Sequence, residues 1–154
     1  MGLLVRNLVF TGLVPGTVAG LVPWLLVGDR APEPGGARVL ALLLFAVGIA
    51  LYGWCVWDFA SFGRGTPAPI DAPRHLVVRG LYRLSRNPMY LGVLAVILGW
   101  AALFAHATVV VYAVAVFTAF HTFVVYYEEP HLAQTFGDEY AAYRASVARW
   151  IGRP

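Results

Sequence analysis

The fold of this chain is decided by residues 87–127, which read NPMYLGVLAVILGWAALFAHATVVVYAVAVFTAFHTFVVYY and contain no Asp, Glu, Lys or Arg. One helical crossing of the bilayer core needs about 20 residues, so this run is long enough for two crossings. The short segment Ala-His-Ala-Thr at 105–108 divides it. We therefore predict two membrane-spanning helices, over about 89–105 and 107–127, joined as a tight hairpin.

Two further charge-free stretches, residues 8–27 and 39–57, precede this run and predict two more spans. Pro15 and Pro23 should kink the first of them, because proline removes a backbone donor and clashes with the preceding turn. Arg6 before an apolar core is also typical of a signal peptide, although the stretch is long for one. We expect a retained span.

Composition agrees with a membrane protein. Sixty per cent of the 154 residues are hydrophobic and 12% are charged, whereas an average soluble domain is roughly 45–50% apolar and about 25% charged. The net charge of +3 is not clustered, which argues against a nucleic-acid partner. The single cysteine, Cys55, excludes an internal disulfide and a multi-cysteine metal site. We predict one all-α integral membrane domain over residues 1–154, with four transmembrane helices.

The arginines predict the orientation. With four spans both termini share one side, together with the loop 58–88 and the tail 128–154, and nine of the eleven arginines lie there. The positive-inside rule therefore places both termini in the cytoplasm, and in a bacterium the membrane would be the inner (plasma) membrane.

The loop and the tail contain most of the polar residues. The loop is rich in proline and glycine and longer than a helix hairpin needs, which is typical of a functional loop. The tail repeats apolar residues at three- and four-residue spacing, which predicts an amphipathic helical segment that Gly137 interrupts. These apolar residues are Leu132, Phe136, Tyr140, Tyr143, Val147 and Trp150. A plain interfacial anchor explains the tail pattern equally well.

Several polar residues need an explanation at the ends of the spans. Adjacent Glu128 and Glu129 oppose the helix dipole where the last span ends, and such carboxylates suit ribose hydroxyls or an ammonium group. Arg86 could bind lipid phosphate or hold a ligand carboxylate in bidentate fashion. His121 is an ionisable group within a span, either functional or a neutral partner between helices. Asp58 could pair with an arginine of the loop.

Motifs for soluble cofactors and metals are absent from the sequence. It contains neither a dinucleotide-binding glycine fingerprint nor a P-loop. The histidines have no spacing partner that suggests a metal site, so we predict none.

Two stretches carry a family resemblance. Residues 65–92, GTPAPIDAPRHLVVRGLYRLSRNPMYLG, resemble the core signature of the isoprenylcysteine carboxyl methyltransferases, a group similar to the phospholipid methyltransferases. Residues 128–143, EEPHLAQTFGDEYAAY, with VARWI at 147–151, resemble the second signature of that family. The resemblance implies S-adenosylmethionine as methyl donor, bound in a cytoplasmic cavity that the C-terminal helices cap and that opens toward the lipid.

The resemblance also implies site residues. The candidate catalytic residues are Arg86 and Glu129, with Glu129 or His121 as the base if one is used. The candidate cofactor-binding residues are Tyr82, Asn87, Pro88, Tyr90, Gly92, Glu128, Glu129, Leu132 and Tyr140. Asn87 departs from the family pattern, because eukaryotic members usually have His there and Asn is no proton acceptor near neutral pH. The leader is also short, without the further N-terminal helix of some members.

The implied function is direct methyl transfer from S-adenosylmethionine to a membrane-soluble acceptor, lipid-like or prenylated, at the cytoplasmic interface. Besides this acceptor, the expected partners are membrane lipids and no nucleic acid. One alternative is a membrane reductase using a nicotinamide cofactor, although those enzymes have more spans. Another is a non-enzymatic helical scaffold, because Gly12, Gly16 and Gly20 permit close helix contact.

Overall fold

The computed structural model describes residue 9, residues 11–63 and residues 75–152. This part of the chain is helical and contains no strand, so the all-α prediction is confirmed. Its helices are η1 (Thr17–Leu21), α2 (Val22–Val27), α3 (Gly36–Asp58), η2 (Phe59–Gly63), η4 (Gly80–Arg83), α4 (Pro88–Phe104), α5 (Ala107–Phe123), η5 (Val124–Glu128) and α6 (Glu129–Ser146). Predictions that involve residues 64–74, including the proline-rich part of the loop, lie outside the described residues.

Two of the four predicted spans are long and apolar enough to cross a membrane. They are the helices Gly36–Phe62, of 27 residues, and Ala107–Ser146, of 40 residues. The described parts of the other two, Thr11–Val27 and Pro88–Phe104, are shorter apolar helices. Both fall below the roughly 20 residues that one crossing needs, so a bundle of four transmembrane helices stays a prediction.

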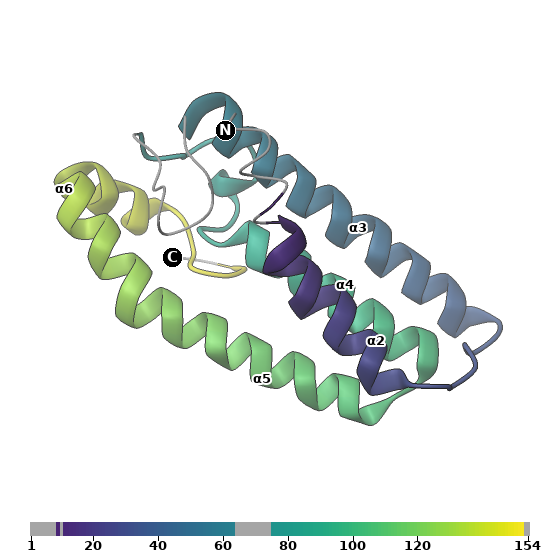
Figure 1. Cartoon of the computed structure of the whole chain (residues 1–154). Coiled ribbons are helices and arrows are strands. Elements are labelled where there is room, and N and C mark those ends of the chain that lie inside the picture. The colour runs from purple at the N-terminus through teal and green to yellow at the C-terminus, as the bar shows by residue number, and fades with distance from the viewer. Residues whose placement is uncertain (1–8, 10, 64–74, 153–154) are drawn as a thin grey trace.

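Helix α4 lies at the centre of the bundle and contacts α2, α3 and α5 (Figure 1). Its closest neighbour is α3, because two glycines face each other across the pair. A Cβ atom on Gly92 would lie 2.9 Å from the backbone oxygen of Gly48, and one on Gly48 would lie 2.6 Å from that of Gly92. Small residues allow two membrane helices to approach this closely.

The ends of the helices can be compared with the predicted hairpin and with the predicted span over residues 39–57. Helix α4 ends at Phe104, Ala105 takes the left-handed conformation, and α5 begins at Ala107, so the predicted hairpin is confirmed. Helix α3 continues past the predicted end at Trp57 into η2. The helix therefore extends beyond the predicted span of 39–57 at both ends, and its apolar pattern continues through Phe59 and Phe62 past the isolated charge of Asp58.

The first helix is irregular around its prolines, as predicted. A π-helical segment, η1, lies between Pro15 and Pro23. The backbone oxygen of Val18 in this segment accepts a hydrogen bond of 2.9 Å from the Tyr112 hydroxyl of α5. Irregular backbone at membrane depth is tolerated where neighbouring helices satisfy its polar groups.

The tail helix α6 continues directly from η5 and folds over one end of the bundle (Figure 1). Gly137 has φ 51° and interrupts α6 as predicted. Tyr140, Tyr143 and Val147 form a buried apolar cluster, with Leu132 and Phe136 packed against it. The prediction that the amphipathic helical segment includes Val147 and Trp150 was wrong, because α6 ends at Ser146 and Val147 has an extended backbone.

The outer surface of the bundle is apolar. Large hydrophobic side chains of α2, α3 and α5 are more than half exposed, which a water-soluble monomer rarely allows. Examples are Leu25, Leu42, Leu43, Ile49, Val111 and Val114. This surface fits contact with lipid and supports membrane association.

Candidate active site

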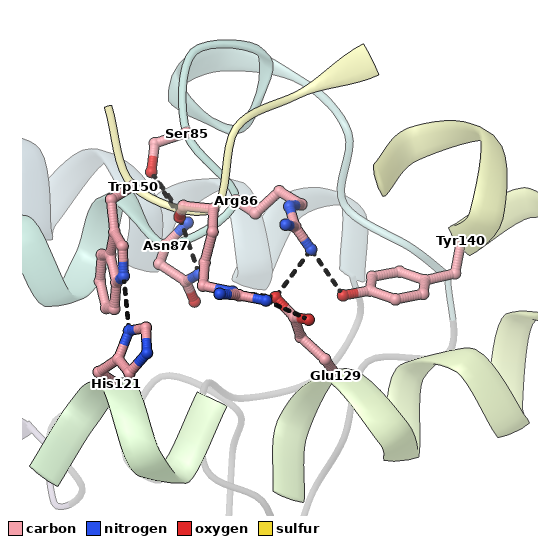
Figure 2. A network of polar contacts seen from close by, with 8 residues as sticks. Ser85, Arg86, Asn87, His121, Glu129, Tyr140 and Trp150 are labelled. Atoms are coloured by element: carbon pink, nitrogen blue, oxygen red, sulfur yellow. Dashed lines mark hydrogen bonds and ion pairs between the residues drawn. The ribbon is translucent and has the colours of Figure 1, made fainter. Parts of the chain in front are cut away.

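A buried carboxylate held by two arginines forms the centre of the candidate site. Glu129, the first residue of α6, is 8% exposed. Its Oε1 atom accepts hydrogen bonds of 2.8 Å from Nη1 of Arg86 and 2.7 Å from Nε of Arg149, and its Oε2 accepts one of 3.1 Å from Nη2 of Arg149 (Figure 2). Nη1 of Arg86 also donates to the hydroxyl of Tyr140 at 3.1 Å.

The arginines control the charge of this carboxylate. Burial alone would raise the pKa of Glu129, but the hydrogen bond from Arg149 and the charges of Arg86 and Arg149 outweigh it. The pKa of Glu129 therefore lies below its ordinary value of 4.5, and the carboxylate is ionised at neutral pH. Three of the roughly four acceptor positions of a carboxylate are thereby taken.

The chain after α6 turns back and contacts the start of α4. We call residues 147–151 the return segment. The backbone N–H of Arg86 donates to the oxygen of Ala148 at 2.9 Å. The oxygen of Arg149 accepts from Nδ2 of Asn87 at 2.9 Å and from Oγ of Ser85 at 3.3 Å. The return segment thus closes the polar end of the bundle against residues 85–87.

A cavity of about 340 Å³ lies next to this network, between the first helix, α3, α4 and α5. Small-molecule sites typically occupy roughly 300–1,000 Å³. Apolar and aromatic side chains form most of its wall. The lining residues with polar side chains are Tyr52, Tyr82, Arg86, Asn87, Tyr90 and Glu128.

The second glutamate has a different environment from the first. Glu128 lines the cavity, and its Oε2 accepts a hydrogen bond of 2.9 Å from the Tyr90 hydroxyl. Arg86, which lines the same cavity, has a buried Nε atom with no hydrogen-bond partner among the described residues. The cavity wall therefore contains one carboxylate and one arginine, and the Nε of that arginine is itself buried.

The short helix η4 is fixed to the end of α3. Asp58 is 1% exposed, and its Oδ1 lies 3.3 Å from Nε of Arg79, so the predicted pairing with a loop arginine is confirmed. Gly80, with φ +55°, touches Asp58, and a Cβ there would lie 2.5 Å from Oδ2. Next along the chain, Tyr82 presents its ring to the cavity, while its backbone oxygen accepts a 2.7 Å hydrogen bond from Tyr143.

His121 contacts the return segment and does not line the described cavity. Its Nδ1 atom accepts a hydrogen bond of 3.1 Å from the indole Nε1 of Trp150 (Figure 2). The Trp150 ring also packs on Phe117, with ring centroids 5.1 Å apart. This geometry matches the expectation of a neutral histidine that bonds a neighbouring segment.

The structure brings most predicted site residues together, and three of them belong neither to the cavity lining nor to the hydrogen-bond network around Glu129. Tyr82, Arg86, Asn87, Tyr90 and Glu128 line the cavity, and Glu129 and Tyr140 contact Arg86. Pro88 is the buried first residue of α4. Gly92 packs against α3, and Leu132 packs against the apolar cluster of the tail. Their roles toward a ligand stay predictions.

Arg149 belongs to this network although its sequence context does not indicate it. It lies 20 residues after Glu129, beyond the reach of any helical spacing. In the sequence it lies in the VARWI stretch of the second signature, which does not indicate Glu129 as its partner. Only the reversal of the chain after Ser146 brings its side chain to Glu129.

In a comparison with protein-family models, the phospholipid methyltransferase family matches residues 37–139. The matched range covers two thirds of the chain, including α3, η4, α4 and the glutamate pair. The chain belongs to the phospholipid methyltransferase family. No curated protein and no solved structure gives a significant match.

As a phospholipid methyltransferase family member, the chain is a membrane methyltransferase. The family assignment agrees with the apolar helices and confirms the suspected family, and the matched range contains the first signature stretch and residues 128–139 of the second.

Proposed function

We propose that this protein transfers a methyl group from S-adenosylmethionine to a membrane-soluble acceptor by direct displacement. The observation that carries the proposal is the cavity itself, which combines an apolar aromatic wall with a carboxylate and an arginine. The family match supports methyl transfer as the reaction class.

The residues of the cavity fit this donor. S-adenosylmethionine has a cationic sulfonium, an amino acid group, a ribose diol and an apolar adenine. The carboxylate of Glu128 suits the ammonium or the ribose hydroxyls, because ionised carboxylates accept strong hydrogen bonds. The positive charge of Arg86 on the cavity wall suits a carboxylate. The aromatic rings suit adenine and attract cationic groups.

When bound, S-adenosylmethionine supplies a methyl group on a sulfonium leaving group, which is already activated. The protein then has to place the two reactants and exclude water, and orientation alone can contribute roughly 7–11 kcal/mol to such a step. Glu128 is held by Tyr90, and Arg86 by Glu129 and Tyr140. These contacts limit the freedom of both charged groups before any ligand binds.

The acceptor should be lipid-like or prenylated and reach the cavity from the membrane. Support comes from the position of the cavity among apolar helices, whose side chains Val14, Val18 and Phe123 form its wall. We further propose that the polar end faces the cytoplasm, as the positive-inside rule predicts from the nine arginines on that side.

Calorimetry on the purified protein in detergent tests the donor. Wild type should bind S-adenosylmethionine, and Glu128→Gln should bind it about tenfold more weakly, the change that 1.4 kcal/mol gives. Glu139→Gln is the matched control, because Glu139 is an exposed glutamate of the same tail. Absence of binding by wild type would contradict the proposal.

A further inference from the structure

We propose that Arg149 is a positioning residue, which holds Glu129 beside Arg86 and so keeps Arg86 in place at the cavity. This inference rests on the proposed function and extends it to a residue outside the matched family range of 37–139. Arg149 itself does not line the described cavity and would act only through Glu129.

The geometry gives Arg149 the larger share of the contacts to Glu129. It contacts both carboxylate oxygens, at 2.7 and 3.1 Å, whereas Arg86 contacts one. A bidentate pair fixes the orientation of the carboxylate as well as its position. With Glu129 oriented in this way, its Oε1 faces Nη1 of Arg86 at 2.8 Å.

The backbone of Arg149 is anchored independently of its side chain. Its oxygen accepts hydrogen bonds from Asn87 and Ser85, the residues that flank Arg86 in the chain. The guanidinium groups of Arg149 and Arg86 therefore extend from two backbone segments that are hydrogen-bonded to each other, and they meet at one carboxylate. A lysine at position 149 would retain the charge without the planar fork.

The charge balance gives the second reason. Glu129 with Arg86 alone would be neutral, and the addition of Arg149 makes the cluster cationic. Arg86 can thus remain attractive to an anionic ligand group although it is paired. The other groups that act on Glu129 are Tyr140 and Arg144 of α6, while Glu128 precedes it at the end of η5.

The test compares Arg149→Met and Arg149→Lys with wild type in two measurements. The first is the Kd for S-adenosylmethionine by calorimetry, and the second is the unfolding temperature in detergent as a function of pH. Arg144→Met is the matched control, because it removes the same charge from an exposed position of α6 without a hydrogen bond to Glu129.

We expect Arg149→Met to weaken binding about tenfold, because Glu129 then loses the bidentate contact that orients it toward Arg86. The acid limb, by which we mean the fall of the unfolding temperature at low pH, should also begin at a higher pH, because Glu129 loses the hydrogen bond from Arg149 that lowers its pKa. Arg149→Lys should restore part of both effects, and Arg144→Met should change both far less. In a Glu129→Gln background, Arg149→Met should add little.

The outcomes separate the two claims. If wild type binds S-adenosylmethionine and Arg149→Met matches it in Kd and acid limb, the positioning role is overturned while the proposed function stands. If wild type does not bind, the proposed function fails, and the acid limb alone decides whether Arg149 holds Glu129. If Arg149→Met does not fold, the Arg149→Lys variant is used in its place. A Kd and an acid limb equal to those of wild type in Arg149→Lys would then overturn the inference.

Discussion

Nη1 of Arg86 donates a hydrogen bond of 2.8 Å to Oε1 of Glu129, although 43 positions separate the two residues in the chain. The contact joins the segment that precedes α4 to the first residue of α6. These two segments enter and leave the hairpin of α4 and α5, and they meet at its open end. The two signature stretches of the sequence therefore make one polar site, which lies beside the cavity.

Arg86→Lys should reduce methyl transfer about a hundredfold, because the lysine ammonium does not occupy the position of Nη1, which donates to both Glu129 and Tyr140, and small misplacements in a site can cost this much. Transfer of labelled methyl from S-adenosylmethionine to extracted lipid measures it. Arg83→Lys, at an exposed position of η4, is the control and should leave the rate unchanged. Equal rates in the two variants would contradict the role of Arg86.

Tyr90→Phe should raise the Kd for S-adenosylmethionine about fivefold, because Glu128 loses the hydroxyl that orients it and one hydrogen bond contributes about 1 kcal/mol. The ring and its contact with Phe120 remain. Calorimetry is the measurement, with Tyr126→Phe as control, since Tyr126 is 79% exposed. An unchanged Kd in Tyr90→Phe would mean that Glu128 needs no support from this hydroxyl.

Gly92→Ala should lower the free energy of unfolding by about 1–3 kcal/mol, the usual cost of overpacking. The new methyl group would meet the backbone oxygen of Gly48, which cannot move aside like a side chain. Thermal unfolding in detergent measures the change. Gly53→Ala lies on the same helix pair with nothing within 4 Å of the added carbon, and it should not destabilise the protein. Equal unfolding temperatures for the two variants would argue against the close contact.

Stability should fall in acid through Glu129. Its pKa is lower in the folded protein than its ordinary value of 4.5. The stabilisation is therefore complete above about pH 4.5 and is lost as the pH falls from there through the folded pKa. Unfolding temperatures between pH 3 and pH 7 measure this limb. Glu129→Gln should flatten it relative to Glu139→Gln, and an identical limb in both variants would assign the acid sensitivity to other groups.

Local signals predict much of the fold. The hairpin at residues 105–107 and the interruption at Gly137 follow from short-range features, namely a break in an apolar run and a glycine in a helical pattern. The pairing of Asp58 with an arginine of the loop follows from the high cost of an unpaired buried charge.

Features that depend on chain reversal could not be predicted. Gly92 meets the backbone of Gly48 in α3. Helix α3 is apolar on all sides, so its sequence does not indicate which side faces α4. The different environments of Glu128 and Glu129 likewise depend on Arg149, which only the return segment brings near. Sequence spacing identified the glutamate pair but could not distinguish its two members.

The central claim is methyl transfer from S-adenosylmethionine to a membrane acceptor at this cavity. Its most direct measurement incubates the purified protein with S-adenosylmethionine labelled in the methyl group and a total lipid extract, and then counts label in the organic phase. The account predicts label in that phase with wild type and Glu139→Gln, and strongly reduced label with Arg86→Lys and Glu128→Gln. Label that stays in the aqueous phase with wild type, or transfer equal in all four proteins, would contradict it.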